Sequence, residues 1–169
     1  MARRRRVYSR SYGRRVKTAK YSNETFCIAQ AVTNTAGNPI TGYFQVIPES
    51  GTLGMRKVKN FTVNMSYKGT EPDQFQRSLF WALVYVPQGT DPSPINVGSN
   101  DTLASLYEPN QNVIMSSITV LNENSRTWKT RLARNLNSGD KIMLVYAGDD
   151  TGGTFNDVIQ LTVNFAISY

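Results

Sequence analysis

Apolar and polar residues alternate along much of the chain with the two-residue period of β-strands. The clearest example is the segment 57–67. Its apolar positions fall on one face: Phe61, Val63, Met65 and Tyr67. Successive side chains of a strand point to opposite faces, so this segment predicts a strand with one face on a core. No stripe with the period of a helix competes, and we expect helix only as a turn near 103–107.

Eight apolar segments of strand length follow one another, with turn residues between them. They span 24–32, 41–48, 57–67, 79–86, 113–120, 126–133, 140–147 and 157–167. The fourth, LFWALVYV, is apolar on both faces, which predicts a central strand covered on both sides. The connection 88–112 contains prolines and is too long for a simple hairpin loop.

Eight strands, one long crossover and no helix to cover a parallel sheet predict two antiparallel sheets packed face to face. The expected fold class is all-β, a single eight-stranded antiparallel jelly-roll sandwich, preceded by a disordered or extended basic N-terminal arm. An immunoglobulin-like sandwich fits the strand count less well. A length of 169 residues is enough for one well-cored domain.

Charge divides the chain near Lys20. Residues 1–20 hold seven Arg, two Lys and no acid, which gives them a charge of +9. The whole chain carries +7, so residues 21–169 are left at −2. Apolar residues are too sparse before Lys20 to bury a core. We therefore expect two parts: a nucleic-acid-binding arm at 1–20 and a jelly-roll domain at 21–169, which is the candidate shell domain.

The composition of the arm predicts sequence-independent binding of a single-stranded nucleic acid. Arg offers forked donors to phosphate and Lys a point charge, and Tyr rings among them can stack on any base. The candidate residues are Arg3, Arg4, Arg5, Arg6, Tyr8, Arg10, Tyr12, Arg14, Arg15, Lys17 and Lys20. A cluster of Lys and Arg also matches a nuclear import signal, which is a compatible second role.

The residues present give little support for catalysis or for metal binding. The chain has no His, no recognisable nucleophile with a base, and one cysteine, Cys27, which we expect to be a buried thiol between Phe26 and Ile28. The segment DDTGGTFND at 149–157 could offer calcium ligands, but it lacks the spacing of a calcium loop, and a hairpin turn explains it as well. We expect no enzyme activity, no cofactor and no metal. No apolar run reaches the length of a membrane span, so no membrane partner is expected.

Three stretches resemble the capsid proteins of small circular single-stranded DNA viruses that encode a replication initiator, the circovirus-like group. They are ALVYVPQGT at 82–90, SLYEPNQNVIMSS at 105–117 and TRLARNLNSGDKIMLVY at 130–146. The resemblance implies a jelly roll in which segments one, eight, three and six form one sheet and two, seven, four and five the other. It implies a small icosahedral shell of roughly sixty copies and an arm directed at a packaged genome. The expectation that this genome is DNA, and that the protein passes through the host nucleus, comes from the resemblance alone. The chain and its arm are shorter than in typical circoviruses.

The arm's charge alone would not neutralise a genome, so we expect the inner wall of such a shell to contribute. The candidate wall residues are Lys57, Lys59, Lys129 and Arg131, with Arg134 beside them. Alternation in the sixth segment would place Trp128, Thr130 and Leu132 on one face and Lys129 and Arg131 on the other. A solvated sheet face or a rim of salt bridges between subunits would account for these charges equally well.

Two rival functions remain open for such a chain. One is a nucleic-acid-binding β-domain with a basic tail that does not assemble, and the other is an enzyme on a β-sandwich. For an assembling coat, the loops 88–112 and 68–77, the second with Phe75 in a polar surround, are the expected subunit contacts.

Overall fold

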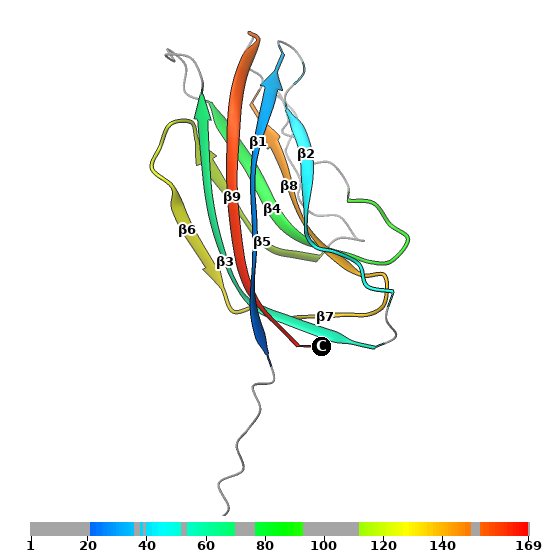
Figure 1. Cartoon of the computed structure of the whole chain (residues 1–169). Helices are drawn as coiled ribbons and strands as arrows, with labels where there is room; N and C mark the ends of the chain where they lie inside the picture. The colour runs from blue at the N-terminus through cyan, green and yellow to red at the C-terminus, as the bar shows by residue number, and fades with distance from the viewer. Residues whose placement is uncertain are drawn as a thin grey trace, which may run out of the picture.

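The structure, a computed structural model, describes residues 21–35, 38, 40–51, 54–69, 77–92, 112–149 and 153–168. Within these ranges, nine β-strands form two antiparallel sheets that pack face to face (Figure 1). None of the described segments forms a helix of the length and apolar character that crossing a membrane requires. The predicted arm at 1–20 and the predicted turn near 103–107 lie outside the described residues.

Both sheets place strands side by side that are far apart in the chain. The first has the order β1 (Ser22–Asn34), β9 (Phe155–Ser168), β3 (Arg56–Gly69) and β6 (Arg126–Thr130), and β7 (Arg134–Leu136) also pairs with β3. The second has the order β2 (Thr41–Ile47), β8 (Lys141–Gly148), β4 (Ser78–Val86) and β5 (Asn112–Val120). This is the jelly-roll order, and it confirms the predicted fold class.

The core lies between the sheets and follows the predicted alternation. The apolar side chains of β3 that the alternation places on one face are all buried: Phe61, Val63, Met65 and Tyr67. From the second sheet, Trp81 of β4 is fully buried, and its Nε1 donates a hydrogen bond to Thr119 Oγ1 (3.2 Å). Trp128 of β6 meets Trp81 edge-on, with ring centroids 5.0 Å apart. Aromatic pairing of this kind adds to area burial in holding two sheets together.

The second sheet is apolar on its outer face as well. A separate buried cluster lies on the face of β4 and β8 that points away from the core: Ala82, Val84, Val86, Met143, Val145 and Ala147. β4 lies between β8 and β5, so the prediction of a central strand covered on both faces is confirmed.

The sixth predicted strand, 126–133, is shorter in the structure: only 126–130 form a strand, and the next strand begins beyond the predicted end. β6 ends at Thr130 and β7 begins at Arg134, because their shared partner β3 changes register. Asn60 of β3 has a positive φ of 57°, and the pairing of β3 with β9 shifts between Lys59 and Thr62. Such a β-bulge adds a residue to one strand and breaks the ladder locally. The expected common face for Leu132 and Trp128 is therefore wrong: Leu132 is 48% exposed in the connection.

Cys27 is exposed, which corrects the expectation of a buried thiol. β1 is an edge strand, and its alternation turns Phe26 and Ile28 toward the core and Cys27 outward. Flanking apolar residues in a strand share the opposite face from the residue between them, so they predict the reverse of what the expectation assumed.

The acidic segment 149–157 connects the two sheets and is not a hairpin, because β8 and β9 belong to different sheets. Its described carboxylates have structural partners. Asp149 Oδ2 accepts a hydrogen bond from the Ser78 backbone N–H (2.8 Å), and Asp157 pairs with Arg77. Among the described residues, no group of three His, Cys, Asp or Glu side chains is placed to hold a metal ion.

A buried polar network closes one end of the sandwich. Arg77, which precedes β4, forms an ion pair with Asp157 of β9 at 2.8 Å, and both side chains are almost fully buried. Tyr67 of β3 donates its hydroxyl hydrogen to the same carboxylate, and the Phe155 ring lies 4.1 Å from the guanidinium. The network therefore joins strands of both sheets through groups that are removed from water.

We predict that Asp157→Asn destabilises the protein by about 3–5 kcal/mol, because it leaves the Arg77 charge buried without its carboxylate. Tyr67→Phe removes one hydrogen bond to the charged carboxylate and should cost about 1.5–3 kcal/mol. Urea unfolding monitored by tryptophan fluorescence measures both, with the exposed Thr154→Ala as control. An Asp157→Asn midpoint equal to that of the control would contradict the role given to the ion pair.

The deprotonation of buried tyrosine hydroxyls makes the stability of the fold depend on pH in the alkaline range. Burial, together with the hydrogen bond to Asp140 (2.8 Å), raises the pKa of Tyr85 to about 12. Burial also raises the pKa of Tyr67 and of Tyr146 above the ordinary value. The folded protein therefore holds these protons more tightly than the unfolded chain does.

We predict that the contribution of Tyr85 to stability is complete below pH 10 and is lost as the pH rises from 10 through 12. Tyr85→Phe should make the decline over this interval shallower, because it removes one of the linked protons. Thermal unfolding followed from pH 8 to pH 12 tests this, and equal slopes for both proteins would show that Tyr85 does not take part.

Candidate nucleic-acid interface

The outer face of the first sheet is covered by uncharged polar side chains that are linked across strands. Thr25 donates to Asn164 (2.6 Å), and Thr33 donates to Asn156 (3.0 Å). Ser66 donates to Gln160, and Thr127 to Asn64. The pairing register puts no Asp or Glu among the described outward residues of this sheet. Apart from β1, whose outward Cys27, Ala29 and Ala31 are apolar, the face is hydrophilic and sets no described carboxylate against a polyanion.

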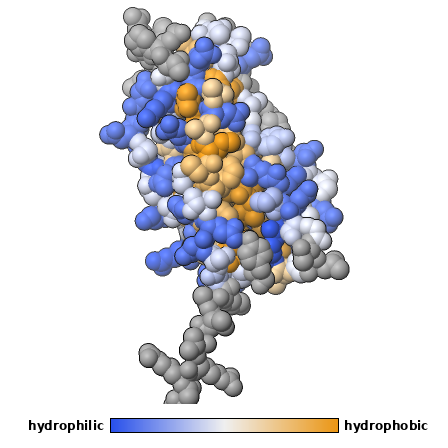
Figure 2. Space-filling model, viewed as in Figure 1, coloured by the Kyte–Doolittle hydropathy of each residue, from blue (hydrophilic) through white to orange (hydrophobic). Residues whose placement is uncertain are grey.

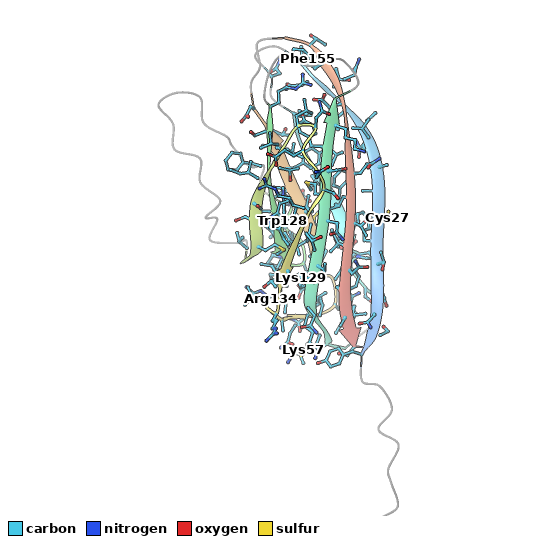
Figure 3. All side chains as sticks on the ribbon, turned by 90° about the vertical axis from the view of Figure 1, so that its left-hand side faces the viewer. Cys27, Lys57, Trp128, Lys129, Arg134 and Phe155 are labelled. Atoms are coloured by element: carbon cyan, nitrogen blue, oxygen red, sulfur yellow. The ribbon has the colours of Figure 1, made fainter. Side chains whose placement is uncertain are left out.

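Three lysines gather at one end of this face. Lys57 lies beside Ser168, Lys59 beside Ala166, and Lys129 beside Thr62. Lys57 and Lys129 are exposed, and Lys59 is half-buried. Figure 3 shows Lys57 and Lys129 in the same half of the sheet, toward the end where β1 begins. The expectation that the third and sixth segments are neighbours and bring these lysines to one surface is confirmed.

The two arginines of the predicted wall have different positions. Arg131 is exposed but follows the end of β6, so it reaches this surface from the connection and not from the strand face. Arg134 is half-buried and lies opposite Val58, whose side chain points into the core. Arg134 therefore does not join the outer face, because paired residues of neighbouring strands share a side. We call Lys57, Lys59, Lys129 and Arg131 the basic cluster.

A groove of about 400 Å³ opens beside the bulge of β3, within the basic cluster. It is lined by Asn60, Phe61, Thr62, Lys129, Thr130 and Arg131. The sequence analysis missed the uncharged part of this lining. The sequence does contain a signal of the bulge. Val58 and Phe61 are both apolar but stand three residues apart, whereas strict alternation requires an even spacing, and both are buried in the structure.

Tyr21, the residue that follows the predicted arm, lies against the basic cluster. The Lys59 ammonium sits 3.8 Å from the centroid of the Tyr21 ring, a cation–π contact. The sequence analysis did not assign Tyr21 a role. This contact shows that the chain leaves the sheet beside the basic cluster, so the charge of residues 1–20 is attached at the cationic end of the face.

The candidate binding residues of the arm lie outside the described residues, and their role stays a prediction: Arg3, Arg4, Arg5, Arg6, Tyr8, Arg10, Tyr12, Arg14, Arg15, Lys17 and Lys20. On the sheet, none of the described outward residues of β1, β9, β3 and β6 is aromatic. The described face therefore offers cations for phosphates without a platform on which bases stack.

No family model matches this chain, and no curated protein matches it. A search of solved structures finds similarity to a chain described as "Structure of infectious bursal disease virus Gt strain", with 12% sequence identity and a TM-score of 0.24. The match covers 88% of this chain and 41% of the other, so this chain spans less than half of that chain's length. A likeness of this extent does not identify a shared function.

Proposed function

We propose that this chain is a viral coat protein that assembles into a small icosahedral shell and packages a single-stranded genome through its basic arm. The observation that carries the proposal is the place of Tyr21. It joins a segment of charge +9 to a jelly-roll sheet at the end where Lys57, Lys59, Lys129 and Arg131 meet.

The positive charge of residues 1–20 continues into the basic cluster, and this favours a joint role of the two in binding nucleic acid. A cationic segment without a required sequence of contacts can bind a polyanion of any sequence, and the basic cluster adds its charge on the sheet. Counterions released from the phosphates drive such binding, so it weakens as salt rises. In this proposal, the outer face of the first sheet is turned toward the packaged nucleic acid, because the face carries lysines and no described carboxylate.

The second sheet has a different place in the proposed shell. Its outer face is apolar and buried at β4 and β8, so it has no basic surface for a genome there. The contacts between subunits are proposed to come from the loops 88–112 and 68–77. Most of both loops lies outside the described residues.

Finer features of the proposal rest on the three sequence stretches that resemble circovirus-like coats. They are a shell of roughly sixty copies, DNA as the packaged nucleic acid, and assembly in the host nucleus after import through the arm. The chain is proposed to act without catalysis and without a cofactor. A β-domain that binds nucleic acid but does not assemble is the alternative, and particle images distinguish the two.

We predict that a chain starting at Tyr21 still forms particles but encapsidates far less nucleic acid than the intact chain, because it lacks the nine positive charges before Tyr21. Electron microscopy of the purified protein gives particle formation, and quantification of nuclease-resistant nucleic acid gives the cargo. If the intact chain yields only monomers that bind nucleic acid, the alternative function holds. Equal cargo in both chains would contradict the role of the arm.

We predict that Lys129→Ser combined with Arg131→Ser lowers binding of single-stranded nucleic acid and reduces its salt dependence. Loss of two phosphate contacts should reduce the slope of log K against log salt by about 1.4. Lys68→Ser is the matched control, because Lys68 is exposed on β3 beside Val158, away from the basic cluster. Filter binding from low to high salt measures the slopes, and equal slopes for the double variant and the control would exclude the basic cluster from binding.

A further inference from the structure

Partly buried apolar side chains lie along both long sides of the sandwich. On the side of β5 and β6, the half-buried Trp128 packs edge-on against Trp81. On the side of β1 and β2, Phe26 and Ile28 of β1 and Ile40 before β2 pack against the core but remain half-buried. Figure 2 shows the result as an apolar strip that runs over β1 and toward β2.

β1 is the edge strand beside this strip. It pairs with β9 over all 13 of its residues without a register shift, and no described strand pairs with its other side. Its outward residues Cys27, Ala29 and Ala31 are exposed. Alternate backbone N–H and C=O groups of an edge strand point away from the sheet, and they form a template for another strand.

β1 has few of the features that usually protect an edge, the exception being Glu24 on its inward side. Proteins guard exposed edges with Lys, Pro, bulges or very short strands. The residues Ser22–Asn34 include no Lys, Arg or Pro, and the strand is long and regular. The opposite edge strand, β6, has only five residues and carries Arg126 and Lys129. The two edges of one sheet therefore differ in their readiness to accept a partner strand.

We propose that the free edge of β1 pairs antiparallel with β1 of a second copy of this chain, across a two-fold axis, so that the first sheets of the two copies become continuous. This inference rests on the proposed function, since it assigns one of the subunit contacts of the shell. The contact would add backbone hydrogen bonds along about 44 Å of strand and cover the half-buried Phe26 and Ile28.

Self-complementarity selects a second copy over other partners. Glu24, near the start of β1, is the only charged residue of the strand. In an antiparallel pair centred at residues 27–29, Glu24 of each copy lies opposite a neutral residue between Gln30 and Asn34 of the other. Like charges are therefore not opposed, and the same apolar side chains meet from both copies. An arginine-rich segment fits this strip poorly, because it would bring charges against apolar side chains.

Single cysteines placed along β1 test the pairing in the full-length protein. The chains compared are the native one, with Cys27, and Cys27→Ser variants that carry Thr25→Cys, Ala29→Cys or Ala31→Cys. Thr127→Cys in the same background is the control, because Thr127 is exposed on β6, the opposite edge. A copper–phenanthroline complex oxidises the thiols, and non-reducing electrophoresis measures the disulfide-linked dimer.

Across a two-fold axis, one β1 position lies opposite itself, so the cysteine or cysteines nearest the axis should form dimer about tenfold more than the Thr127→Cys control, with lower yields farther from it. Dimer yields at all four β1 positions equal to that of the control would overturn the pairing, even if particles form and package nucleic acid. The informative β1 amides are those that point away from β9. If these amides are protected from hydrogen exchange in a protein that stays monomeric, another segment occupies the edge, which would also overturn the pairing.

A charge variant gives a second, independent measurement. Ala29→Lys combined with Ala31→Lys puts like charges across the proposed contact and leaves the core untouched, because both residues are exposed. We expect the dimer fraction to fall about tenfold, with no such loss in Thr127→Lys. Dimers unchanged by the two lysines would overturn the pairing. Cross-linked dimers without any shells would support the pairing and contradict the proposed coat function.

Discussion

Insertion of β9 between β1 and β3 is the interaction on which the rest of this structure depends. On one side, β9 pairs with the whole length of β1, and on the other it pairs with β3 before and after the bulge. The last described strand therefore lies inside the sheet, between the first strand and the third. It supplies Asp157 for the buried ion pair with Arg77. It also brings Tyr21 beside the lysines of β3 and leaves β1 as an edge. Because these pairings are long-range, loop-closure entropy must be overcome before they form.

The two sheets share a core but present unlike outer surfaces. On the first sheet, short polar side chains bond to one another across strands, and lysines collect at one end. On the second, small apolar side chains of β4 and β8 are buried on the outer side. This difference gives the proposed shell an inside and an outside, because a cluster of lysines lies on the described outer face of the first sheet and an apolar cluster on that of the second.

The bulge at Asn60 links this local geometry to the proposed binding surface. It places Lys57 and Lys59 on the same outward side as Thr62, although Val58 and Phe61 both point into the core. It also separates β6 from β7, so that Arg131 reaches the groove from a connection. Bulges commonly redirect side chains in this way, and here the effect is a cationic groove at the edge of a regular sheet.

Sequence alone determined which segments are strands and which of their faces are apolar, because a period of two is a local property of neighbouring residues. It therefore predicted the core face of β3, the central position of β4 and the concentration of charge before Lys20. A family resemblance was needed to predict the order of the strands, since pairing depends on long-range contacts. Only the tertiary structure decided that Cys27 is exposed, that Asp157 pairs with Arg77, and that Tyr21 lies against Lys59. Each of these depends on which strand lies beside which, and distant segments settle that by burying their apolar faces together.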